Sequence, residues 1–100
     1  MNAKIQDENM DSLFKAILTL RTTDECYKFF DDLCTVPELK AMSQRFAVAR
    51  MLTERFIYTD IVNATGASTA TISRVARALN YGSEGYHMVF ERTSKETNAE

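Results

Sequence analysis

Hydrophobic side chains recur along this chain at spacings of three and four residues, the period of an amphipathic helix. In the first such stretch they fall at Met10, Leu13, Phe14, Ile17 and Leu18. This stripe predicts a helix from Met10 to about Arg21, with one apolar face that needs a partner. The residues before it are mostly polar, so we expect residues 1–9 to be flexible.

Two capping boxes indicate where the next helices begin. Thr22 is followed three residues later by Glu25, and Thr35 by Glu38, a spacing at which each side chain can bond the other residue's backbone N–H. Pro37 suits the first turn of the later helix, where a missing N–H costs no helical bond. We therefore expect a second helix after Thr22 and a third over residues 37–53. The second helix turns four side chains inward: Cys26, Phe29, Phe30 and Leu33.

The third expected helix is apolar around more of its circumference than packing on one neighbour requires. Its apolar surface is formed by Leu39, Met42, Phe46, Ala49 and either Met51 or Leu52. Such a helix lies at the centre of a fold or in a subunit interface.

Three shorter helices complete the pattern. One spans residues 58–64 and stops before Gly66; the next begins after Ser68, a suitable N-cap, and runs to about Leu79. The last covers residues 83–92, and we expect residues 93–100 to form a disordered tail. The chain has only three glycines and one proline, too few for a turn-rich sheet. The sequence thus predicts an all-α fold of about six helices in one domain over residues 10–92.

The helix after Ser68 has two unlike faces. Ile72, Ala76 and Leu79 fall on one side, flanked by Val75, and are expected to pack. The opposite face carries short residues and two arginines: Thr69, Ala70, Ser73, Arg74 and Arg77. Short side chains allow close approach to a DNA groove, and arginines can bond guanine or phosphate. Close helix packing with solvated arginines is the alternative explanation of this face.

Two helices joined by a short turn that contains glycine make a helix-turn-helix, here over residues 58–79. Two positions depart from the usual pattern of this motif: Val62 stands where a small residue is common, and Thr65 where leucine is common. The expected DNA-contacting residues are Tyr58, Thr59, Ser68, Thr69, Ala70, Thr71, Ser73, Arg74 and Arg77.

Charge is distributed unevenly along the chain. The formal net charge is −2, but residues 1–39 carry −4, residues 40–80 carry +4 and residues 81–100 carry −2. A basic block of this kind can attract a polyanion such as DNA although the total is acidic.

Other classes of function find little support in the residue types. No apolar run is long enough to span a membrane and no export signal is evident, so we expect a cytoplasmic protein without a membrane partner. Cys26 and Cys34 are expected to be core thiols, because no second pair completes a metal site. With His87 as the single histidine, no catalytic set of nucleophile, base and orienting group can be assembled, and we expect no enzyme, metal or cofactor.

The segments LCTVPELKAMSQRFAVARML and YTDIVNATGASTATISRVARAL resemble the Trp repressor family, in particular its YerC/YecD-type branch. The resemblance extends from about Met10 to Arg92. It implies an intertwined all-helical homodimer that binds double-stranded DNA through two helix-turn-helix heads. The wide apolar surface of the third helix would then be shared between subunits.

The resemblance also implies a possible effector pocket. Tryptophan-responsive members bind the ligand with two arginines and a threonine, which match Arg45, Arg74 and Thr35. The glycine that makes room for the indole ring is Val75 here, and a serine is Ala78. The pocket is therefore partly filled and lacks one polar partner, so we do not expect tryptophan to be the ligand. The alternatives for Arg45 and Arg74 are a structural ion pair, a DNA phosphate or another effector.

The sequence as a whole predicts a sequence-specific transcriptional regulator, a repressor by the resemblance, that acts as a homodimer. The alternative from another class is an all-helical module that uses the same face to bind a protein.

Overall fold

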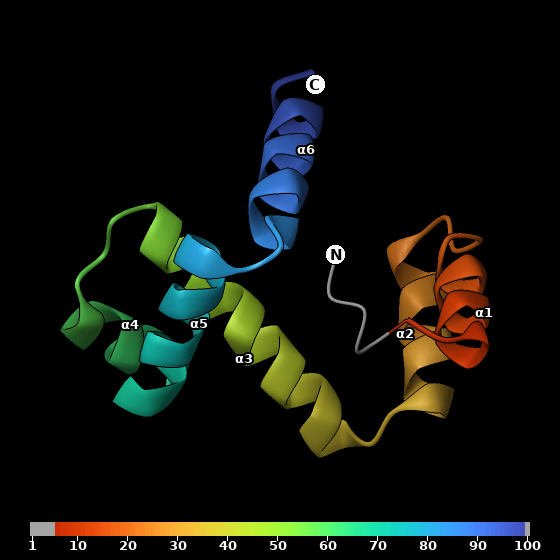
Figure 1. Ribbon diagram of the computed structural model, residues 1–100, viewed down its shortest axis with the longest axis horizontal. Coiled ribbons are helices and arrows are strands. Elements are labelled where there is room, and N and C mark those ends of the chain that lie inside the picture. The colour runs from red at the N-terminus through yellow and green to blue at the C-terminus, as the bar shows by residue number, and fades with distance from the viewer. Residues whose placement is uncertain (1–5, 100) are drawn as a thin grey trace. The chain divides into compact units, whose positions relative to one another are not determined.

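The computed structural model describes residues 6–99, side chains of residues 96–99 excepted, and this part of the chain contains six helices and no strand (Figure 1). The helices are α1 (Glu8–Ile17), α2 (Thr23–Leu33), α3 (Val36–Thr53), α4 (Tyr58–Thr65), α5 (Thr69–Tyr81) and α6 (Gly85–Ala99). The all-α prediction is confirmed.

The predicted caps form in the structure. Thr22 accepts a hydrogen bond from the Glu25 N–H (3.1 Å), and the Glu25 carboxylate accepts one from the Arg21 N–H (2.8 Å). Asp7 caps α1 by accepting from the Met10 N–H, so α1 begins inside the segment that we expected to be flexible. Residues 1–5 lie outside the described residues.

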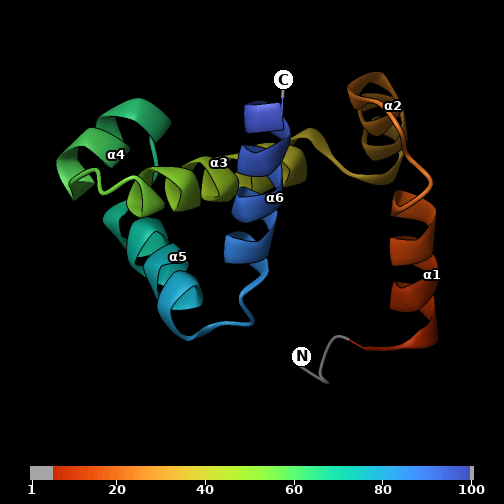
Figure 2. The same ribbon diagram turned by 90° about the horizontal axis from the view of Figure 1, so that it is seen from above.

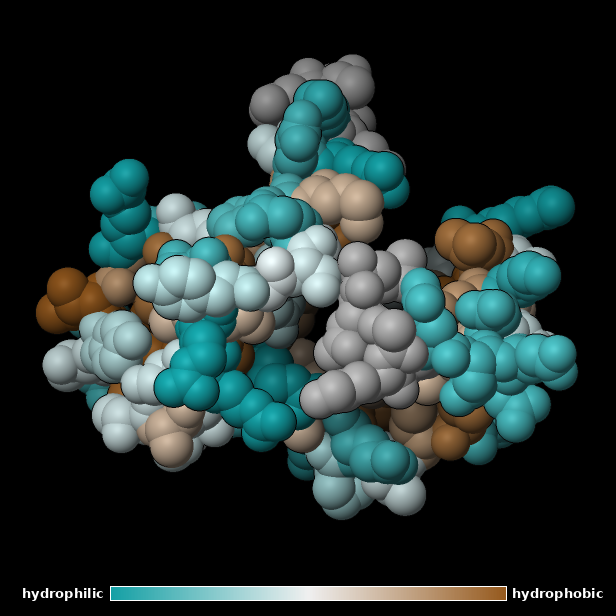
Figure 3. All heavy atoms as spheres, in the orientation of Figure 1, coloured by the Kyte–Doolittle hydropathy of each residue, from teal (hydrophilic) through white to brown (hydrophobic). Residues whose placement is uncertain are grey.

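The chain divides into two compact units, Met1–Leu39 and Lys40–Glu100. We call them the first and second unit. Within the first unit, neither α1 nor α2 contains a residue buried within this chain. Hydrophobic atoms accordingly reach the surface over α1 and α2 in Figure 3.

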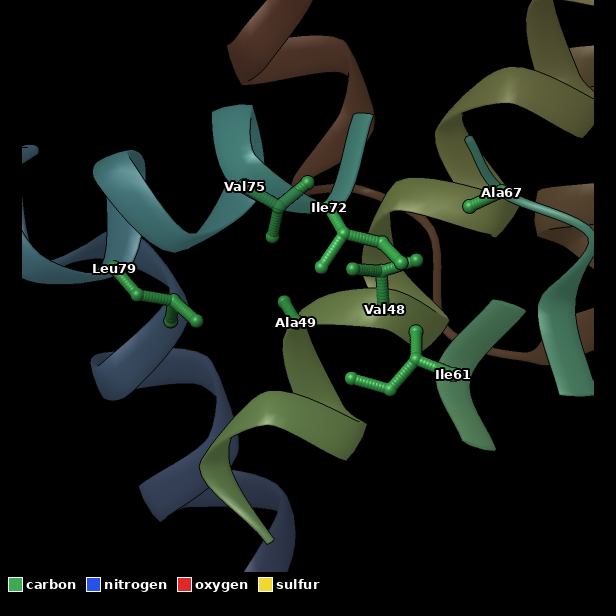
Figure 4. Close-up of a cluster of buried hydrophobic side chains, with 7 residues drawn as sticks. All are labelled: Val48, Ala49, Ile61, Ala67, Ile72, Val75 and Leu79. Atoms are coloured by element: carbon green, nitrogen blue, oxygen red, sulfur yellow. The ribbon is translucent and has the colours of Figure 1, made fainter. Parts of the chain in front are cut away.

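The core lies in the second unit, where α4 and α5 pack beside the C-terminal part of α3 (Figure 2). Its seven buried side chains converge in Figure 4: Val48, Ala49, Ile61, Ala67, Ile72, Val75 and Leu79. They come from α3, α4, the turn and α5. This cluster fixes the position of α5 against α3.

The C-terminal helix is longer than predicted. The predicted start at Ser83 is wrong because Glu84 has a φ of 66°, which no α-helix continues, and α6 begins at Gly85. It continues to Ala99 through most of the segment expected to be a disordered tail. Local bonds support the extension: Lys95 pairs with Glu91 at 2.9 Å, and the Thr93 hydroxyl donates to the Val89 carbonyl. Residue 100 lies outside the described residues.

Candidate nucleic-acid interface

The turn between α4 and α5 has a defined geometry. Gly66 adopts a left-handed conformation with a φ of 72°, and its N–H donates to the Val62 carbonyl at 2.8 Å. Left-handed backbone favours glycine because a Cβ is penalised there. The expected role of Gly66 in ending the first motif helix is confirmed.

Thr65, the departure from the usual leucine, is part of this turn. Its hydroxyl donates to the Ile61 carbonyl (2.7 Å) and accepts from the Ala67 N–H (3.1 Å). The Thr65 carbonyl in turn accepts a bond from Gln44 Nε2 on α3 at 3.1 Å. The polar side chain therefore replaces apolar packing with two hydrogen bonds, and the bond from Gln44 to the backbone carbonyl adds a third contact that holds the turn. Val62 is half-buried and packs against the core cluster.

The N-terminus of α5 is capped by Ser68. Its hydroxyl oxygen accepts from the Thr71 N–H at 3.1 Å, and its hydroxyl donates to the Thr71 side chain at 3.1 Å. Both hydroxyls are thus engaged with each other. Among the hydroxyl residues expected to contact DNA, Ser68 and Thr71 therefore already use part of their hydrogen-bonding capacity within the chain.

The two faces of α5 separate as predicted. Ile72, Val75 and Leu79 are 0%, 2% and 7% exposed. The residues of the opposite face, Thr69, Ala70, Ser73, Arg74 and Arg77, are all exposed. We call these five residues the α5 face.

Two further predicted contacts lie at the start of α4. Tyr58 and Thr59 are exposed, and the N-cap position is Ile57, whose side chain makes no capping bond. The first backbone N–H groups of α4 therefore have no side-chain acceptor of their own.

The arginines of the α5 face carry unneutralised charge. Within the described residues the salt bridge is Lys95–Glu91, and neither Arg74 nor Arg77 pairs with a carboxylate. Burial of the apolar side of α5 orients both arginines away from the core. The second unit thus presents positive charge and short hydroxyl side chains together.

The three expected effector residues lie in different units of the chain. Thr35 belongs to the first unit, whereas Arg45 and Arg74 are exposed residues of the second. Thr35 forms the predicted capping box with Glu38: its hydroxyl accepts from the Glu38 N–H (3.3 Å), and Glu38 accepts from its N–H (2.8 Å). The backbone bond from Thr35, together with the side-chain bond, lowers the pKa of Glu38 below its ordinary value.

Val75 lies in the core rather than beside an open pocket. It is 2% exposed and belongs to the buried cluster with Val48, Ala49 and Leu79. Ala78, the other position that departs from the tryptophan-binding pattern, lines an apolar hollow instead. Within the described chain, side-chain packing occupies the space around Val75.

The cysteines differ from expectation. Cys26 is exposed and Cys34 half-buried, and neither is in a disulfide. The prediction of a core thiol is wrong for Cys26 in this chain, because α2 buries none of its residues. Among residues 6–99 no cluster of three or more potential metal ligands occurs, and no helix is long and apolar enough to cross a membrane.

Gln44 is a structural residue whose role could not be identified from the sequence. A polar residue on a wide apolar helix carries no signal of its partner, because Thr65 lies 21 positions away. A hollow lined by Leu52, Arg55, Asn80 and His87, among others, was missed for the same reason, because these residues are distant in sequence.

Comparison with known proteins places these features in a family. Residues 8–94 match the family model described as Trp repressor protein. The uncharacterized protein YerC of Bacillus subtilis (strain 168) is 53% identical over 97 residues, which cover 97% of this chain and 92% of YerC.

Two solved structures are also similar. A TrpR-like protein from Eubacterium eligens is 55% identical, with a TM-score of 0.90 over 93% of this chain and 96% of that one. A Staphylococcus aureus protein proposed to be a Trp repressor is 49% identical, with a TM-score of 0.88 over 91% of each chain.

Proposed function

The chain belongs to the Trp repressor family, and from this membership we propose that it is a sequence-specific DNA-binding transcriptional regulator, acting as a homodimeric repressor through α4 and α5. The regulatory, non-enzymatic role of the family agrees with this proposal. The partners are double-stranded DNA and a second copy of the chain.

The exposed α5 face is the observation that carries the proposal. Its residues are held outward because the opposite side of the same helix is almost fully buried. Thr69 and Ser73 offer hydroxyls, Ala70 a methyl group for thymine, and Arg74 and Arg77 charged donors. Tyr58 and Thr59 at the start of α4 suit the DNA backbone.

A homodimer is supported by apolar surface that the single chain leaves open. Both α1 and α2 are amphipathic, but the single chain buries neither apolar face. In and next to these helices, Leu18 is 82% exposed, Tyr27 75% and Val36 58%. A second apolar region is a hollow of about 460 Å³ in the second unit. Its lining residues are Phe46, Ala78, Gly82, Ser83, Gly85, Tyr86, Met88 and Val89. Association of two chains would remove such surface from water, at a gain of roughly 25 cal/mol for each Å².

In the proposed dimer the two α5 helices lie about 34 Å apart, one turn of DNA, so that a pseudo-palindromic operator is contacted symmetrically. DNA binding in this proposal does not require tryptophan, because Val75 packs in the core and Thr35 is engaged in a cap.

Selection of bound sequences from a random DNA pool tests the proposal. It is performed at about 50 mM and 200 mM salt, a range over which non-specific phosphate contacts weaken strongly. We expect a palindrome to be enriched at both concentrations, with and without tryptophan. Recovery of unenriched DNA at low salt alone would contradict sequence-specific binding.

A protein-interaction module is the second candidate function. The observation that favours it is an exposed apolar run that leads into the start of α4: Phe56 (44%), Ile57 (65%) and Tyr58 (41%). If no DNA is recovered at either salt concentration, this function replaces DNA binding.

A further inference from the structure

A hollow in the second unit lies where the C-terminal end of α3, the last turns of α5 and the first turn of α6 meet. Its volume is about 460 Å³, within the range of pockets for small molecules. The lining residues are Leu52, Thr53, Arg55, Ala76, Leu79, Asn80 and His87. Asn80 is about 16 Å along the α5 axis from Thr69, so this hollow is separate from the start of the recognition helix.

The lining combines hydrogen-bond donors with an apolar wall. Arg55 supplies a guanidinium group and Asn80 a carboxamide, while Leu52, Ala76 and Leu79 supply hydrocarbon surface. No Asp or Glu lines this hollow. Such a set suits an anion attached to a short apolar body, because the arginine can bond a carboxylate in bidentate fashion.

A second, independent observation about Arg55 is its unusual backbone conformation. Arg55 has a φ of 68°, and the N–H groups of Arg55 and Phe56 donate to the carbonyls of Leu52 and Met51, both at 3.1 Å. This is the Schellman arrangement that ends many helices, and glycine is the residue that it favours. The chain places a long cation at a position where glycine would be less strained.

His87 fixes the opposite wall. Its Nε2 lies 2.9 Å from the Leu79 carbonyl oxygen, so this nitrogen carries the hydrogen and donates it. The bond joins the first turn of α6 to the last turns of α5. The hollow is therefore bordered by Arg55 and by the His87 ring, whose orientation is fixed by this hydrogen bond.

We propose that this hollow is a binding site for a small organic carboxylate, in which Arg55 holds the carboxylate and Leu52, Ala76 and Leu79 contact its apolar body. Ligand binding at this site does not depend on whether the chain binds DNA, so it can be tested without an operator. A ligand in this hollow contacts α3 and α5 and lies beside His87, the residue of α6 in the lining.

The full chain is titrated with 3-phenylpropionate while the backbone amide resonances are followed by NMR. We expect saturable shifts in the low-millimolar range at Leu52, Ala76 and Asn80. The uncharged analogue 3-phenylpropionamide should shift these resonances far less. Absence of saturable shifts with 3-phenylpropionate, or equal binding of the two compounds, overturns the proposal.

Two variants and a control locate the site. Arg55→Gly and Arg55→Asn remove the cation with residues that accept left-handed backbone, so the fold is retained. Each should weaken binding by at least about tenfold, the effect of losing a charge-assisted hydrogen bond. Arg92→Ala removes the same charge from α6, outside the lining, and should leave binding unchanged. Unaltered binding by both Arg55 variants overturns the assignment.

Discussion

Gln44 of α3 donates a hydrogen bond from Nε2 to the carbonyl oxygen of Thr65, 3.1 Å away at the last residue of α4. The bond ties the turn of the helix-turn-helix to the helix on which both motif helices pack. The carbonyl of the last residue of a helix has no N–H partner within that helix, and here Gln44 supplies the donor instead.

Gln44→Ala should therefore lower the free energy of unfolding by about 1 kcal/mol, because the Thr65 carbonyl loses its partner. Urea denaturation measures the change. Lys40→Ala, at an exposed position of the same helix, serves as the control and should alter stability by less than about 0.5 kcal/mol. Equal losses in the two variants would show that the bond to Thr65 contributes nothing.

Gly66→Ala isolates the effect of left-handed backbone. A Cβ at Gly66 meets no atom within 4 Å, so the cost is conformational and amounts to about 1 kcal/mol. Gly85 has equally open surroundings but no positive φ, and Gly85→Ala should be neutral or stabilising. Thermal unfolding of both variants checks the difference, and a stable Gly66→Ala protein would contradict the role assigned to the turn.

Ser68 and Thr69 are neighbours with different expected roles. Ser68→Ala removes the cap of α5 and should cost about 1 kcal/mol of stability. Thr69→Ala removes an exposed hydroxyl that makes no internal bond, so stability should stay near wild type while affinity for the selected operator falls. Calorimetry and DNA titration on the same samples separate the two effects. A loss of stability in Thr69→Ala as large as that in Ser68→Ala would contradict the separate roles of the two residues.

Arg77 is expected to bond a DNA phosphate. Arg77→Ala should weaken binding to all sequences and reduce the slope of log affinity against log salt by about 1. Fluorescence anisotropy over a range of salt concentrations measures this slope, with Arg92→Ala as the control. Relaxed specificity at one base pair would instead identify Arg77 as a base contact, and unchanged affinity would exclude it from the interface.

Val75 is expected to keep the recognition helix in place without a ligand. Val75→Ala removes buried volume and should cost about 2 kcal/mol, and Val75→Gly about 1 kcal/mol more because glycine disfavours helix. If the valine side chain holds α5, DNA binding should weaken in both variants, and more in Val75→Gly. Operator titration with and without tryptophan checks this. Wild-type affinity in a destabilised Val75→Gly protein would argue against it.

The sequence predicted those features whose causes are local. Thr22, Thr35 and Ser68 each cap through a residue three positions later, so the starts of their helices could be located within one or two residues. The two faces of α5 were also predicted, because helical periodicity alone separates Ile72 from Ser73.

Features that depend on distant residues could not be predicted in this way. The bond from Gln44 and the hollow beside Arg55 join residues far apart in the chain. The exposure of Cys26 has a related cause: periodicity indicated an apolar face on α2, but it does not say whether the same chain or a second one covers that face. Ser68 was expected both to cap α5 and to contact DNA, and the structure contains the cap.

The central claim is that two copies of the α5 face contact one operator. The most direct test is titration of the selected palindrome against a version in which the half-sites are moved apart by about 5 base pairs, half a turn of DNA. Two α5 helices fixed in a dimer cannot reach both half-sites after that change. We predict that affinity for the altered DNA falls to the level of a single half-site. Equal affinity for the two DNAs would contradict recognition by a symmetric dimer.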